Sequence, residues 1–143
     1  MATPENTFIG SVHRHLPAGI YSMKNHNQYN GGIPDVWYSG PTGDLWIEYK
    51  FIVIPKRDDT PINVNLSELQ KDWLAARHDE GRRVGVIVGS KNGGVWMPGT
   101  VWQIPHTAKS FSAAMVGRPG LATIINHLTN GGSDSQPQRN RLG

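Results

Sequence analysis

The sequence predicts an α/β protein whose mixed central β-sheet is flanked by helices, with the elements in the order α-β-β-α-β. Three observations predict this class: an amphipathic N-terminal segment, two strand-like segments joined by a Gly-Pro turn, and a second amphipathic segment followed by a continuous apolar run. The chain has 143 residues, of which 37% are hydrophobic, and this fits one compact domain. We place that domain at residues 1–129 and expect the polar residues 130–143 to form a flexible tail.

The first predicted element is a helix over residues 4–15. Thr3 followed by Pro4 is typical of an N-cap with proline at the first helical position, and Gly19 lies beyond the expected end. One face of this helix is apolar and carries Phe8, Ile9, Val12 and Leu16. At about 100° per residue, Glu5 falls in the middle of this apolar stripe, so an acidic side chain points towards the core.

A β-hairpin follows a polar loop at residues 24–32. Residues 33–39 are rich in apolar and aromatic side chains, residues 40–43 read Gly-Pro-Thr-Gly, and residues 45–54 are strongly apolar. Residues 55–64 combine prolines with four charges and are expected to form a loop.

The second predicted helix begins at Asn65 and ends before Gly81. Glu68, three residues after Asn65, indicates a capping box, and glycine is typical of a helix end. Its apolar side carries Leu66, Leu69, Trp73 and Leu74. The apolar run at residues 84–88 then has the pattern of a strand buried on both faces. Further on, residues 93–104 are expected to form a hairpin and residues 121–128 a short closing helix.

Strand alternation brings chemically active side chains to one face of the second hairpin strand. Glu48 and Lys50 share this face with Trp46 and Ile52, while the other face of the strand belongs to the core. The hairpin turn brings Asp35, which follows a proline, across from Glu48. Trp46 is therefore placed to stack on a base, whereas the other tryptophans are expected in the core.

Two carboxylates and an ammonium in one place suit phosphodiester hydrolysis. Asp35 and Glu48 can hold one or two Mg²⁺ ions, which polarise a phosphate and lower the pKa of an attacking water. The ammonium of Lys50 can orient that water or stabilise the charge of the transition state. The alternative is an ion-pair cluster on a half-exposed sheet, which needs no function.

The order of these motifs resembles the PD-(D/E)XK nuclease superfamily. Gly32-Ile33-Pro34-Asp35 and Glu48-Tyr49-Lys50 are followed by the helix from Leu66 to Leu74, Gly81 and the buried strand, which is the order of the VRR-Nuc branch. That branch is similar in fold to Holliday-junction resolvases, and the resemblance implies a restriction-endonuclease-like core. It covers roughly residues 4–90, and residues 91–143 match nothing in the family pattern.

The resemblance also implies residue roles and an activity. Asp35 and Glu48 would be metal ligands, the Tyr49 backbone carbonyl a third, and Lys50 the catalytic lysine. The implied protein is a Mg²⁺-dependent endonuclease, with Mn²⁺ able to substitute, that hydrolyses DNA phosphodiester bonds at branched or structured sites such as junctions or flaps. A restriction-type or general DNA-repair nuclease is the alternative within enzymes. A catalytically silent DNA-binding module is the alternative of another class.

Two further residues have roles in the family pattern. Glu5 would match the acid of the first helix and act at the metal site, although the helix dipole alone favours an acid there. Gln70 would match the helix glutamine that supports the metal site, although a buried glutamine satisfied by backbone groups has the same pattern.

The charge and composition of the chain indicate which kinds of partner it can bind. The formal charge of +3 and a pI near 9.4 favour polyanions, and Lys56, Arg57, Arg82 and Arg83 either contact phosphates or form an ordinary solvated surface. The absence of cysteine excludes disulfides, and with no apolar run long enough for a bilayer we expect a cytoplasmic protein without a membrane partner. Paired nicks at a junction would need a homodimer, for which the apolar face of the first helix is a candidate unless it packs internally.

Overall fold

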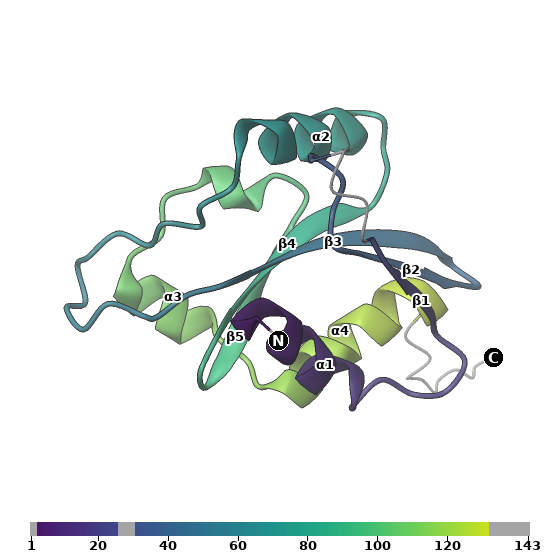
Figure 1. Cartoon of the computed structure of the whole chain (residues 1–143), viewed down its shortest axis with the longest axis horizontal. Helices are drawn as coiled ribbons and strands as arrows, with labels where there is room; N and C mark the ends of the chain where they lie inside the picture. The colour runs from purple at the N-terminus through teal and green to yellow at the C-terminus, as the bar shows by residue number, and fades with distance from the viewer. Residues whose placement is uncertain (1–2, 26–30, 132–143) are drawn as a thin grey trace.

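A computed structural model describes residues 3–25 and 31–131 of the chain. Its centre is a five-stranded sheet in the spatial order β1-β2-β3-β4-β5 (Figure 1). The strands are β1 (Tyr21–Lys24), β2 (Val36–Gly40), β3 (Gly43–Phe51), β4 (Val84–Ser90) and β5 (Gly93–Pro98). β3 and β4 pair in parallel and the other neighbours pair antiparallel, so the predicted mixed sheet is confirmed.

Helices cover both faces of the sheet. They are α1 (Pro4–His13), α2 (Glu68–Asp79), α3 (Ala108–Ala114) and α4 (Arg118–Asn130), with a 3-10 turn at Val101–Gln103. Figure 1 shows α1 and α4 below the sheet and α2 above it. Each side of the sheet has its own hydrophobic core, one containing Phe8 and Leu121, the other containing Leu74 and Phe111. This three-layer arrangement explains why β4 is buried along its whole length.

α1 begins as the sequence predicts. The Thr3 hydroxyl accepts a hydrogen bond from the Asn6 backbone N–H at 3.1 Å, and the helix ends at His13. Its apolar residues Phe8, Ile9 and Val12 are buried against the sheet and α4. The face considered above for a dimer is thus part of the protein's own core.

One glycine lets α1 approach the sheet closely. A Cβ atom at Gly89 in β4 would come within 2.7 Å of the Phe8 ring. Phe8 is fully packed, so that contact would need the helix to move.

The first difference from the sequence prediction concerns residues before the hairpin. β1 was not predicted, and Lys24, expected at the start of a loop, is its last residue. The remainder of that expected loop lies partly in residues 26–30, outside the described residues. β3 ends at Phe51, and Val53, expected to face the core, is 89% exposed.

The start of α2 also differs from the prediction. The N-cap is Ser67, which accepts from the Gln70 backbone N–H, and Gln70 rather than Glu68 completes the capping box. Asn65 lies before the helix with a left-handed φ of 63°. Leu69, expected on the apolar side, is 63% exposed.

Beyond β4 the expected hairpin at residues 93–104 is wrong. β5 turns back directly onto β4, with Ser90 paired to Gly93, and the 3-10 turn follows. α3 was not predicted, and α4 is longer than the expected residues 121–128. Of the expected tail, Asn130 ends α4 and Gly131 caps it, while residues 132–143 lie outside the described residues. No described helix is long and apolar enough to cross a bilayer.

Candidate active site

The hairpin register brings Asp35 to Glu48. Val36 pairs with Ile47, so one residue further along this register Asp35 faces Glu48 on the same side of the sheet. The Asp35 Oδ2 atom accepts a hydrogen bond from the Tyr49 backbone N–H at 2.9 Å. The β3 backbone therefore fixes the orientation of this carboxylate.

Glycine permits the approach of this segment to α2. A Cβ atom at Gly32, three residues before Asp35, would lie 2.6 Å from the Leu69 carbonyl oxygen. The segment Gly32-Ile33-Pro34-Asp35 therefore packs directly against the start of α2 at Leu69.

Glu48 is the centre of the site. It is only 3% exposed, and its Oε2 atom accepts a hydrogen bond from the Gln70 side-chain amide at 3.1 Å. Lys50 Nζ lies 3.6 Å from the same oxygen. Among the described residues the Glu48 Oε1 atom has no hydrogen-bond partner, although it is buried. A buried carboxylate oxygen without a donor is costly unless another group binds it.

The capping box of α2 orients the Gln70 amide. Gln70 Oε1 accepts from the Ser67 backbone N–H at 3.0 Å, which leaves the amide nitrogen to donate to Glu48. One side chain thus closes the helix and holds the buried carboxylate. The predicted inward orientation of Gln70 is confirmed, and its partners are now defined.

Burial changes the protonation of Glu48. Removal from water, then the negative charge of Asp35 and a hydrogen bond with Asp35, raise the pKa of Glu48 to about 8, although the ammonium of Lys50 opposes this rise. In the protein without a bound cation, this carboxyl therefore holds a proton at neutral pH. A cation at Oε1 would displace that proton.

Glu5 approaches the site from α1. It lines a cavity of about 450 Å³ together with Lys50 and with the chain after β3, whose remaining lining residues are Phe51, Ile52, Val53, Pro55, Pro61, Ile62, Asn63, Val64 and Asn65. Burial raises the pKa of Glu5, Lys50 lowers it, and Asp35 adds to the rise. The charges of Lys50 and Asp35 therefore shift the pKa of Glu5 as well as that of Glu48.

The described donors fit a hard divalent cation. Among the described residues, no group of three His, Cys, Asp or Glu side chains lies close enough to form a metal site. The predicted ligands are Asp35, Glu48, the Tyr49 backbone carbonyl and Glu5. The first three are two side chains and one backbone oxygen and do not depend on such a group, whereas adding Glu5 would require one. All three donors are oxygens, which Mg²⁺ and Mn²⁺ prefer, and Glu48 has a free buried oxygen. The role of Glu5 as a direct ligand stays a prediction.

A buried hydroxyl chain on the other side of the sheet was not predicted. The Tyr38 hydroxyl lies 2.6 Å from the Tyr49 hydroxyl and 2.7 Å from His13 Nε2. Burial raises the pKa of both tyrosines. The chain links α1, β2 and β3 directly beneath Asp35 and Glu48. Its signal in the sequence was the presence of tyrosines at core-facing positions of both hairpin strands, because a buried hydroxyl needs a partner.

The basic residues considered for DNA contact are engaged in different ways. Arg57 pairs with Asp59 and Arg82 pairs with Glu80, in each case at the protein surface. Arg83 donates to the carbonyl oxygens of Thr42 and Leu128, so it ties the hairpin to the end of α4. Arg83 thus has a structural role that the sequence did not indicate.

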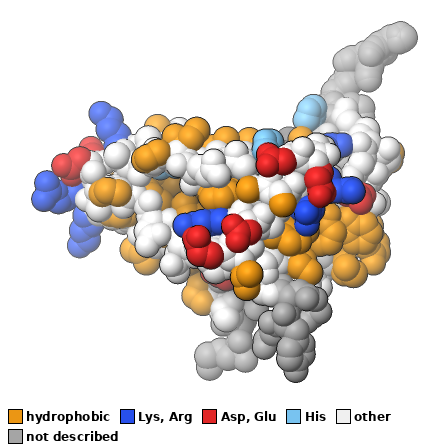
Figure 2. Space-filling view, turned by 90° about the horizontal axis from the view of Figure 1, so that it is seen from above, with side chains coloured by type: hydrophobic (Ala, Val, Ile, Leu, Met, Phe, Trp, Pro, Cys, Tyr) orange, Lys and Arg blue, Asp and Glu red, His pale blue; other side chains and the backbone are white. Residues whose placement is uncertain are grey.

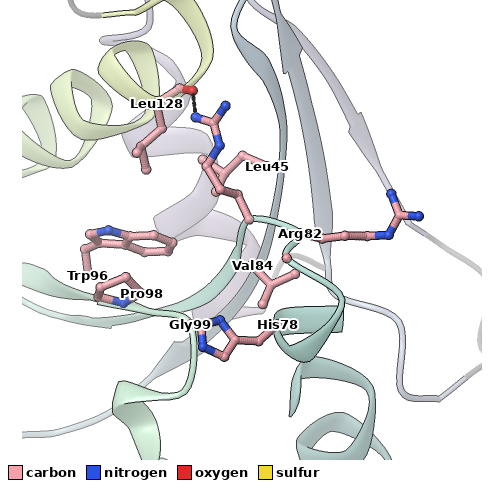
Figure 3. A pocket seen from close by; sticks show the side chains of 10 residues that line it. Leu45, His78, Arg82, Val84, Trp96, Pro98, Gly99 and Leu128 are labelled. Atoms are coloured by element: carbon pink, nitrogen blue, oxygen red, sulfur yellow. Dashed lines mark hydrogen bonds between the residues drawn. The ribbon is translucent and has the colours of Figure 1, made fainter. Parts of the chain in front are cut away.

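A second cavity, of about 350 Å³, is apolar and lies at the opposite end of β3 and β4 (Figure 3). Leu45 and Val84 line it, with Trp96, Pro98 and Leu128 gathered on one side and Arg82 turned away. No carboxylate is among the described residues that line it. It therefore lacks the chemistry of the first site.

Comparisons with known proteins place the fold. No protein-family model matches the chain, and no match was found among curated proteins. Among solved structures the chain is similar to Hjc of Archaeoglobus fulgidus, a Holliday junction resolvase from an archaeal hyperthermophile. The TM-score is 0.52 at 14% sequence identity, over 85% of this chain and 97% of that one. The chain therefore shares the fold of a resolvase.

Proposed function

We propose that this protein is a metal-dependent nuclease that hydrolyses phosphodiester bonds of branched or otherwise structured DNA at Asp35, Glu48 and Lys50. One observation carries the proposal: a buried glutamate with a free oxygen atom lies beside a fixed aspartate and 3.6 Å from a lysine. An ordinary surface ion pair would not bury Glu48 or leave its Oε1 atom without a donor. The resolvase-like fold supports branched DNA as the substrate class.

Each residue has a distinct task in this proposal. Asp35, Glu48 and the Tyr49 carbonyl would hold Mg²⁺ or Mn²⁺, which supplies Lewis-acid polarisation of the phosphate and a water of lowered pKa. Lys50 donates hydrogen bonds to the phosphoryl oxygens as negative charge develops in the transition state. Glu5, which lines the cavity with Lys50, would act at the metal site from that side, as the family pattern implies.

The proposed substrate bears on whether the protein acts as a homodimer or as a monomer. Symmetric nicks in a four-way junction need two active sites related by a two-fold axis. The apolar face of α1 is buried in the core, so a homodimer would have to use another surface. A monomer acting on flaps, in a general repair role, is the alternative that this burial favours.

A panel of DNA substrates tests the proposal. We expect the protein to cut a four-way junction or a flap in Mg²⁺ or Mn²⁺, faster than a linear duplex, and to cut nothing in EDTA. Light scattering with and without the junction gives the oligomeric state. Binding of the substrates without cleavage in either metal would contradict the proposal and indicate a DNA-binding module.

The Gln70 amide gives a prediction of its own. Gln70→Ala should lower the cleavage rate by about 10- to 100-fold, because Glu48 loses the donor that orients it. Ser67→Ala is the matched control: it removes the capping hydroxyl and costs about 1 kcal/mol of stability but keeps the donor to Glu48. Equal activity of the two variants would show that Gln70 serves only the helix cap.

A further inference from the structure

Four aromatic side chains form a continuous row on the sheet and α2. Tyr21 contacts Trp37 with ring centroids 5.5 Å apart, Trp37 stacks on Trp46 at 6.0 Å, and Trp46 meets Trp73 at 5.6 Å. We call Tyr21, Trp37, Trp46 and Trp73 the aromatic row. The sequence placed Trp37 and Trp73 in the core, but both are partly exposed, and Trp37 belongs to neither hydrophobic core.

The row lies on the same sheet face as the candidate site. Met23 pairs with Trp37 and Trp37 pairs with Trp46, so their side chains share a face. Trp46 precedes Glu48 by two residues on β3, which is about 6.6 Å along a strand. A nucleotide next to a phosphate bound at Glu48 therefore reaches the row.

This part of the sheet is open to solvent. Tyr21 is 55% exposed and Met23 is 45% exposed, whereas on the neighbouring β2 the residues that face the other side of the sheet, Val36 and Tyr38, are buried. Figure 2 shows hydrophobic side chains gathered towards the right of this face, the side on which Figure 1 places β1 and β2. An exposed apolar surface of this kind is typical of a binding site.

Arginines border the row. Arg77 lies over the Trp73 ring, 5.5 Å from its centroid, and pairs with Glu80 at 2.9 Å. Arg82 and Arg83 line a cavity of about 450 Å³ with Trp46, and acidic residues also line it, namely Asp44 and Glu80. Flat aromatic rings bordered by guanidinium groups suit bases attached to phosphates better than the aliphatic surface of a protein.

We propose that the aromatic row binds unpaired bases of the DNA substrate by stacking, beside the phosphate that is cleaved. The inference rests on the proposed nuclease function and makes it more specific. Bases can stack on protein side chains only where they are released from the duplex. Flaps and splayed arms are therefore bound better than a fully paired junction.

Binding to a 15-nucleotide oligothymidine and to a blunt duplex, measured by fluorescence anisotropy in EDTA, tests the row without cleavage. Trp37→Leu and Tyr21→Ala should each weaken oligothymidine binding by about tenfold and leave duplex binding within about twofold. Tyr21 is exposed, so its loss does not disturb the core. Trp102→Leu, outside the row, is the matched control and should bind both DNAs as the wild type does.

The outcomes separate this inference from the proposed function. Wild-type binding by both row variants overturns the row as a base-binding site, and so does an equal loss on single-stranded and duplex DNA. A change from dimer to monomer in Trp37→Leu, seen by light scattering without DNA, overturns it in favour of a second copy of the chain. If the wild type cuts no DNA while oligothymidine binding depends on the row, the inference stands and the nuclease function fails.

Discussion

Lys50→Ala is expected to lower the single-turnover cleavage rate by at least about 100-fold while DNA binding and thermal stability stay close to wild type. Loss of a single preorganised donor to developing charge has effects of this size. Lys50 is 15% exposed and its ammonium lies beside Glu48, so it reaches both the carboxylate and a phosphate at the cavity. Because its interaction strengthens in the transition state, the effect falls on the rate more than on affinity.

The control for this variant is another lysine on the same side of the sheet. Lys71 lies on α2 and pairs with Glu68 at 3.3 Å, away from Glu48. Lys71→Ala removes one positive charge without touching the site and should cut at nearly the wild-type rate. Equal rates for wild type and Lys50→Ala, or equal losses for both variants, would show that the assignment of Lys50 is wrong.

Glu48→Gln is expected to abolish cleavage and Mg²⁺ binding and, in EDTA, to make the protein more stable at pH 8. The folded protein holds a proton on Glu48 up to a pKa of about 8, whereas the unfolded chain releases it near the ordinary glutamate pKa of 4.5. The unfolded state therefore binds fewer protons between these values, and the free energy of unfolding falls as pH rises through this window. The amide cannot ionise, so the fall disappears.

Thermal unfolding at pH 5 and pH 8, together with calorimetric Mg²⁺ titration, measures both effects. At pH 8 the variant should melt on the order of 10 °C above wild type, and at pH 5 the difference should be small. Glu68→Gln, an exposed glutamate on α2, should show neither effect. Unchanged Mg²⁺ binding in Glu48→Gln would refute the proposed ligand set, whatever the stability.

Local sequence rules account for most of the elements around the site. Thr3-Pro4 sets the start of α1, and the Gly-Pro-Thr-Gly turn with strong alternation in β3 sets the hairpin register. That register alone is enough to bring Asp35 to Glu48, because a hairpin fixes which residues face one another. The convergence of Asp35, Glu48 and Lys50 was therefore predictable, and so was the inward direction of Gln70.

Elements that depend on tertiary contacts were not predictable. β1 is a four-residue edge strand with mostly exposed side chains, so it shows no apolar alternation. α3 is short and is held by contacts with the loop after β3, where Pro61 pairs with Thr107. Asn65 and Ser67 both fit a capping pattern, and the structure selects Ser67 since Asn65 has a left-handed backbone.

The aromatic row shows a different limit of sequence reasoning. A tryptophan is usually assigned to the core because of its size, and alternation does not show whether a helix covers that part of the sheet. Among the described residues, Tyr21 and Met23 at the β1 end of this face are exposed, and the sequence could not distinguish this face from a buried one.

The most direct test of the proposed site is metal-triggered cleavage of a bound substrate. Wild-type protein and Asp35→Asn are each bound to a labelled flap in EDTA, excess Mg²⁺ is added, and the product is followed over time. Asp35→Asn keeps an acceptor for the Tyr49 N–H but removes one of the two carboxylate charges. We predict that wild-type product appears only after Mg²⁺ is added and that Asp35→Asn forms none. Product in EDTA, or equal product from Asp35→Asn, would contradict a metal-dependent nuclease built on Asp35 and Glu48.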